Sequence, residues 1–209
     1  MRKLAIMFLC AMTVVWLGGC GTSFDASAYL QAILDNSYKN DSSLLVSQKV
    51  GTAEEAAELY NQTINLQVDA MLSGTNPTDA QKDEYRQIVK DILNAAKYTV
   101  GEAEKQDDNS YVVTVTYEKM NVFLPALENL NARSEDQKVI WEESDEEVTL
   151  EDVYKWQIDT YKECLKSALE NVTYEAPEDM TVRIKLSGRT YSPDTSDIES
   201  LSNALFDSN

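Results

Sequence analysis

Residues 85–117, which read YRQIVKDILNAAKYTVGEAEKQDDNSYVVTVTY, contain the change of hydrophobic period that decides the fold class. Up to Ala96 the apolar residues recur every three or four positions, as they do on the buried face of an amphipathic helix. The period then falls to two: residues 98–100 begin a strand, residues 107–110 form a polar turn, and residues 111–117 alternate as a second strand. This stretch therefore predicts a helix followed by a β-hairpin.

A comparable succession occurs nearer the C-terminus. A helix is expected from Thr149 to about Glu170, and residues 172–187 then have the pattern of a second hairpin that turns at 177–179. We expect the hairpins at 98–117 and 172–187 to form one antiparallel sheet of about four strands, with amphipathic helices packed on one face. The predicted fold class is therefore α+β. True duplication and chance similarity both remain open as the origin of the two helix-hairpin units.

Amphipathic patterns and capping signals define the remaining helices. A first helix is capped by Asp25 or Ser27, and capping boxes begin at Thr52 and Thr78. The expected helices beyond the two units cover residues 24–38, 52–74, about 125–131 and a C-terminal segment that begins with a capping box at 196–199. Residues 39–51 are expected to form a polar connection. Because no linker rich in Pro, Gly or Ser interrupts the chain, we expect residues 25–209 to be a single domain.

The N-terminus has the features of a secretory signal. Arg2 and Lys3 precede an apolar run over residues 4–16, which is shorter than the roughly 18 residues that a membrane-spanning helix needs. Residues 1–19 are therefore expected to be a signal peptide. An ordinary signal that is cut and discarded is the alternative to one that directs lipidation.

The end of this signal, Leu17-Gly18-Gly19-Cys20, resembles the lipobox of bacterial lipoproteins. The resemblance implies that a diacylglyceryl group is attached to the Cys20 sulfur and that a peptidase cuts before Cys20. Residues 20–24 then become a lipidated tether, and the protein is anchored in the cell membrane on its extracytoplasmic face.

The chain after the lipobox resembles small lipoproteins of Gram-positive bacteria that belong to families of domains of unknown function. The resemblance rests on FDASAYLQAILDNSYKND at 24–41, AEKQDDNSYVVTVTYEKMNVF at 103–123 and YSPD at 191–194. Such families carry no established catalytic residues that could be transferred to this chain. The order of helices and hairpins is also similar to cystatin-like and NTF2-like folds, which is an analogy of fold alone.

The charge and composition exclude several classes of function. The chain has 36 Asp and Glu residues against 18 Lys and Arg residues, a net charge of −18, and removal of Arg2 and Lys3 makes it −20. A chain this acidic repels nucleic acid and anionic lipid, so no nucleic-acid partner is expected and the lipid on Cys20 must supply the membrane attachment. The absence of histidine excludes Ser-His-Asp and Cys-His catalysis and histidine-ligated metals.

No cofactor, metal or catalytic residue is expected from the remaining motifs. The five glycines of the mature chain form no nucleotide-binding pattern, and the Asp107-Asp108-Asn109 turn lacks the spacing of a calcium loop. Cys164 lies in an apolar helical stripe and is expected to be a buried structural thiol. It has no partner for a disulfide, because Cys10 leaves with the signal and Cys20 carries lipid.

Two tryptophans point to a contact surface. Trp141 and Trp156 flank residues 142–152, which contain seven acids and no base, so a ligand or partner surface there is conceivable. We expect a binding or interaction module at the cell envelope, with an unknown envelope protein or small ligand as partner, and not an enzyme. The alternatives are a carboxylate-dependent envelope enzyme, since acids are abundant, and a small solute-binding lipoprotein of a transporter.

Overall fold

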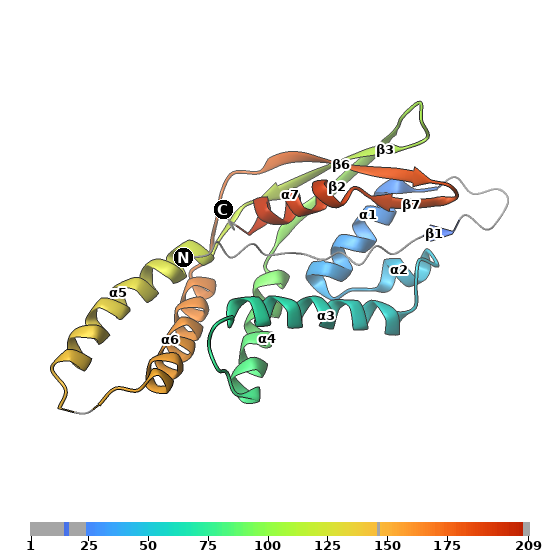
Figure 1. The fold of residues 1–209 in the computed structure, drawn as a ribbon. Helices are drawn as coiled ribbons and strands as arrows, with labels where there is room; N and C mark the ends of the chain where they lie inside the picture. The colour runs from blue at the N-terminus through green and yellow to red at the C-terminus, as the bar shows by residue number, and fades with distance from the viewer. Residues whose placement is uncertain (1–14, 17–23, 146, 207–209) are drawn as a thin grey trace.

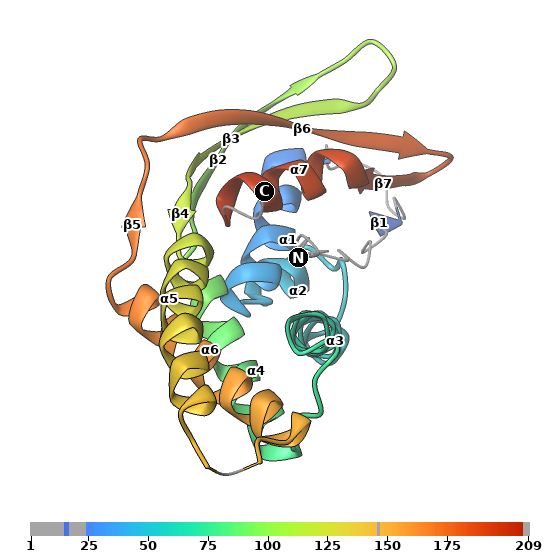
Figure 2. The same ribbon diagram turned by 60° about the vertical axis from the view of Figure 1, so that its left-hand side comes forward.

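A layer of helices covers one face of a twisted antiparallel sheet (Figures 1 and 2). The computed structural model describes residues 15–16, 24–145 and 147–206. The strands are β1 (Val15–Trp16), β2 (Lys97–Lys105), β3 (Tyr111–Glu118), β4 (Met120–Asn121), β5 (Thr173–Tyr174), β6 (Glu178–Ser187) and β7 (Thr190–Pro193). The helices are α1 (Ala26–Leu34), its π-helical continuation η1 (Asp35–Lys39), α2 (Ser43–Ser47), α3 (Ala53–Met71), α4 (Asp79–Asn94), α5 (Phe123–Glu142), α6 (Leu150–Glu170) and α7 (Thr195–Leu205).

The main sheet has the strand order β1-β7-β6-β3-β2, and every neighbouring pair is antiparallel. β2 and β3 form the hairpin predicted from the change of period, with Val100 opposite Val115. On β3 the alternating residues Val113, Val115 and Tyr117 are buried against the helices, as their pattern predicted. The α+β class and the sheet of about four main strands are therefore confirmed.

The expected hairpin at 172–187 is wrong. β5 pairs with β4 in a separate two-stranded sheet, where Met120 lies opposite Tyr174. β6 pairs instead with β3 and with β7, so the C-terminal hairpin is β6–β7. Its two-residue loop begins at Gly188, which has φ 63°, a conformation that glycine adopts without steric cost. The second unit therefore has no hairpin equivalent to that of the first.

Two further helical segments differ from expectation. The helix expected over about 125–131 extends as α5 from Phe123 to Glu142. Only Ala126 of α5 is fully buried, because this helix packs mainly on α6 and therefore carries no broad apolar stripe. Residues 39–51 are not simply a polar connection, since they contain α2, whose Leu45 is buried.

The helix N-termini follow the predicted capping chemistry with one exception. Thr52, Thr78 and Thr149 each accept a hydrogen bond from the backbone N–H three residues on, and the side chain of that third residue accepts from the threonine N–H. Asp25, rather than Ser27, caps α1. The box expected at 196–199 is absent, because Asp194 caps α7 from one residue before its start.

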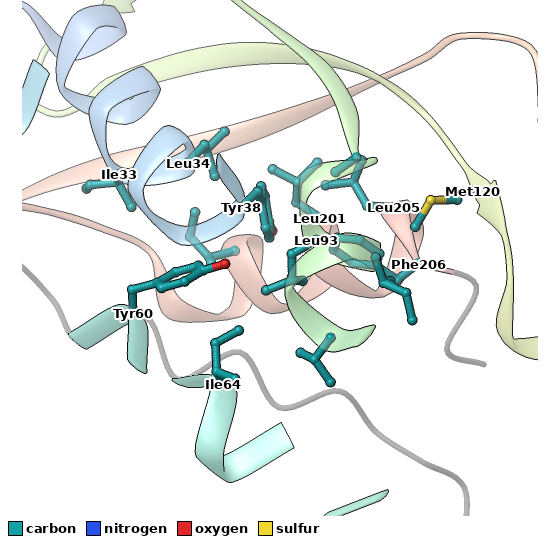
Figure 3. Packing of buried hydrophobic residues seen from close by; sticks show 14 of the residues in the cluster. Ile33, Leu34, Tyr38, Tyr60, Ile64, Leu93, Met120, Leu201, Leu205 and Phe206 are labelled. Carbon is teal, nitrogen blue, oxygen red and sulfur yellow. The ribbon is translucent and has the colours of Figure 1, made fainter. Parts of the chain in front are cut away.

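The interior is a single cluster of buried hydrophobic residues that joins the helices to the sheet. Figure 3 shows Tyr38 of η1 beside Phe206 and Leu201 at the C-terminal helix. The ring of Tyr38 makes edge contacts with Phe206 at 5.4 Å and with Tyr98 at 5.6 Å between centroids. The Tyr38 hydroxyl and the Ser202 hydroxyl share a buried hydrogen bond of 2.8 Å. η1 and α7 are thereby fixed to the sheet.

Candidate functional site

The helices α5 and α6 form an antiparallel pair that projects from the end of the molecule (Figures 1 and 2). α6 contacts α5 along one side and α4 along another. We call the far end of this pair the hairpin tip and define it as the described residues among 138–156. At about 1.5 Å per residue, the 20-residue α5 is about 30 Å long.

Polar contacts join α6 to α4 at Ile158, Asp159 and Lys162. The Tyr85 hydroxyl donates to the Ile158 carbonyl at 2.8 Å, and Lys162 Nζ lies 2.7 Å from a Glu84 carboxylate oxygen. That hydrogen bond raises the pKa of Lys162. On α6, Gln157 is exposed and the next residue, Ile158, is buried.

The hairpin tip exposes large apolar side chains. Val139, Ile140 and Leu150 are 52%, 59% and 72% exposed. They make up three of the six large hydrophobic side chains that are exposed in the described part of the chain. None of the three was predicted, because the helix that carries Val139 and Ile140 was expected to end near residue 131. The signal that could have revealed them is the apolar run VIW at 139–141, directly before the acidic stretch.

The two tryptophans that flank the acidic stretch meet at the tip. The rings of Trp141 and Trp156 are 5.6 Å apart between centroids and inclined by 72°, an edge-to-face contact. Both side chains are partly exposed. The contact joins the last turn of α5 to the first turns of α6, and it presents aromatic surface beside the exposed apolar residues.

Acidic side chains occupy the same segment of the chain. Glu142, Glu143, Asp145, Glu147 and Glu151 are all exposed. A further acid of the stretch has a structural role, since hydrogen bonds from Thr149 cap α6 and lower the pKa of the Asp152 carboxyl. In the described residues no group of three or more acidic or thiol side chains is arranged to hold a metal ion. The exposed apolar side chains of the tip therefore lie in a region of negative electrostatic potential.

The predicted lipid-attachment residue Cys20 lies outside the described residues. No helix in the described ranges is long and apolar enough to cross a membrane. The described body of the chain starts at Phe24, whose ring stacks on Tyr191 at 4.0 Å between centroids. This start lies beside the main sheet, at the opposite end of the molecule from the hairpin tip in both views (Figures 1 and 2).

Cys164 lies on α6 within the core and is fully buried, as the sequence predicted. Burial raises the pKa of its thiol, which lowers the fraction of reactive thiolate. The neighbouring Arg133 and Glu163 side chains form an ion pair of 3.0 Å between α5 and α6.

Replacing Cys164 with Ala should lower the free energy of unfolding by about 1 kcal/mol, because the change removes one buried sulfur and leaves a small cavity. Urea unfolding of the two proteins measures this difference. A thiol reagent should modify native Cys164 only on the time scale of local opening. Rapid labelling of the folded protein would show that the thiol is accessible.

No family model and no curated protein matches this sequence. Among solved structures, the chain is similar to the crystal structure of a "putative lipoprotein (ycdA)" from Bacillus subtilis, with a TM-score of 0.54 and 16% sequence identity. The likeness covers 87% of this chain and 56% of that chain, so this chain spans little more than half of the length of that protein. At this identity the comparison shows a shared fold. The likeness to cystatin-like and NTF2-like folds stays a prediction.

Proposed function

We propose that the protein is a lipoprotein, anchored through Cys20 on the extracytoplasmic face of the cell membrane, that acts as a non-catalytic interaction module. In this proposal the hairpin tip is its contact surface. The observation that carries the proposal is the collection of exposed apolar side chains at the end of a projecting helix pair.

Leaving these side chains in water has a free-energy cost. Burying a side chain such as Leu150 or Ile140 is worth about 1.5–3 kcal/mol relative to leaving it exposed. Apolar residues that gather on one projecting element are typical of surfaces that bind a partner. Tryptophan is enriched among the residues that dominate binding energy, and Trp141 and Trp156 lie beside the exposed residues.

The position of the tip fits a tethered protein. The lipobox would fix the chain to the membrane through residues that precede Phe24, and the tip lies at the other end of the molecule. A net charge of −20 after processing would keep the body away from anionic headgroups. The tip would then face partners away from the membrane surface. The shared fold with the "putative lipoprotein (ycdA)" from Bacillus subtilis supports the assignment as a lipoprotein.

A photo-crosslinking amino acid at Ile140 should capture an envelope protein in intact cells, because this side chain is 59% exposed on the proposed surface. The matched control is the same amino acid at Leu66, which is 51% exposed on α3. Crosslinked bands, detected by immunoblot, should appear for the Ile140 position and not for Leu66. Identical bands from both positions, or none from Ile140, would contradict a contact role for the tip.

A further inference from the structure

The chemistry of the hairpin tip also indicates what kind of partner it binds. We infer that its occupant is a cationic amphipathic segment, one that presents Lys or Arg side chains beside apolar ones, on a protein of the envelope. This inference rests on the proposed function, because it assigns a partner to the same surface.

The negative charge at the tip is concentrated and largely uncompensated. Residues 138–156 hold seven acids and two lysines, so about a tenth of the chain carries −5 of its net charge of −18. Lys138 lies 3.9 Å from Glu142, and both side chains are about two-thirds exposed, so this ion pair contributes little. Acids within about 8 Å of one another still repel at physiological ionic strength. A cationic partner would relieve this repulsion.

The apolar residues determine the second half of the partner's chemistry. A purely cationic partner would leave Val139, Ile140 and Leu150 in water, whereas an apolar segment without charge would leave the surrounding carboxylates unmatched. A segment with both features satisfies both parts of the surface. The partly exposed faces of Trp141 and Trp156 can also accept Lys or Arg side chains through cation–π contacts.

Charge argues against two other occupants of the tip. A second copy of this chain would place one acidic tip against another, and like charges brought together at an interface cost several kcal/mol. An anionic lipid surface would be repelled in the same way. Electrostatic complementarity therefore selects a cationic partner for this apolar surface.

The tryptophan fluorescence of the mature protein can report binding at the tip. Trp16 lies in the predicted signal, so Trp141 and Trp156 are the tryptophans that remain after processing. We would place the mature lipoprotein in phosphatidylcholine nanodiscs and titrate it with a synthetic amphipathic helix of about 18 Leu and Lys residues. Tryptophan emission should shift to shorter wavelength, because a bound apolar face removes water from the indole rings.

The tip variants have charge-matched and size-matched controls. Glu143→Lys with Glu147→Lys should weaken binding about tenfold, a loss of about 1.4 kcal/mol, and so should Ile140→Ser with Leu150→Ser. Glu54→Lys with Glu58→Lys makes the same change of charge at exposed sites of α3, and Leu66→Ser removes an exposed apolar residue there. Both controls should change the dissociation constant less than about twofold.

Two further peptides separate the inference from the proposed function. A Lys-Ser peptide of equal charge and a Leu-Glu helix of equal apolar content should both bind at least about tenfold more weakly than the Leu-Lys helix. If the Leu-Glu helix binds as well, the inference is wrong although the tip remains a contact surface. If binding is equal in the tip and control variants, the tip is not the site, and both proposals fail. If no peptide binds, the inference also fails, and crosslinking at Ile140 then decides the proposed function separately.

Discussion

Replacing Cys20 with Ser should move the protein from the membrane fraction to the soluble extracytoplasmic fraction. In the proposed function, lipid on the Cys20 sulfur supplies the whole membrane attachment. Each buried acyl CH₂ contributes about 0.8 kcal/mol, and two chains give stable anchoring. The acidic body would be repelled by anionic lipid. The expected loss of membrane binding is therefore nearly complete.

Fractionation followed by immunoblotting measures this change, and mass spectrometry of the N-terminal peptide detects the lipid. The matched control is Cys164→Ala, which removes the other cysteine of the mature chain and should leave the protein in the membrane fraction. Retention of the Cys20→Ser protein in the membrane, together with an unmodified N-terminus in the wild type, would exclude lipid anchoring at this residue.

Local signals in the sequence were sufficient for most of the helices and for one hairpin. A capping box involves residues only three apart, so Thr52, Thr78 and Thr149 could be identified as helix starts without tertiary information. The β2–β3 hairpin is local as well, since its two strands are joined by the short turn that contains Asn109. These features depend on residues that are neighbours in the chain.

Long-range pairing could not be predicted in the same way. Residues 172–175 have the pattern of a strand, but β5 pairs with β4, which lies about fifty residues earlier in the chain. The partner of such a short strand is set by how α5 and α6 fold back on each other, because these two helices connect β4 to β5. The C-terminal hairpin did have a local signal, the Gly188-Arg189 loop, although the turn was expected at residues 177–179.

The candidate site was predicted only in part, for a related reason. Trp141 and Trp156 were noted because they flank the acidic stretch, and the structure brings their rings together. The exposed residues beside them were missed because α5 packs mainly on α6 and shows no broad apolar stripe. A helix that projects from the core buries few side chains, so its hydrophobic residues show little periodicity. Its exposed apolar residues are available to a partner, but the sequence pattern does not reveal them.

The end of the chain has the largest stability effect that we expect. α7 ends at Leu205, and the next residue, Phe206, has no exposed surface and packs edge-on against Tyr38 (Figure 3). Phe206→Ala should therefore lower the free energy of unfolding by about 3–5 kcal/mol through lost burial and a cavity between η1 and α7. Domains of this kind have a total stability of about 5–15 kcal/mol, so the variant should be partly unfolded at elevated temperature.

Urea unfolding followed by circular dichroism measures this effect, and Leu124→Ala is the control because Leu124 is 51% exposed on α5. The control should change the free energy of unfolding by less than about 0.5 kcal/mol. Equal effects of the two substitutions would show that the C-terminal residues contribute little to the core. A large effect of Phe206→Ala alone would show that α7, the last helix of the chain, is needed to close the core under the sheet, so that truncation before residue 206 should destabilise the whole fold.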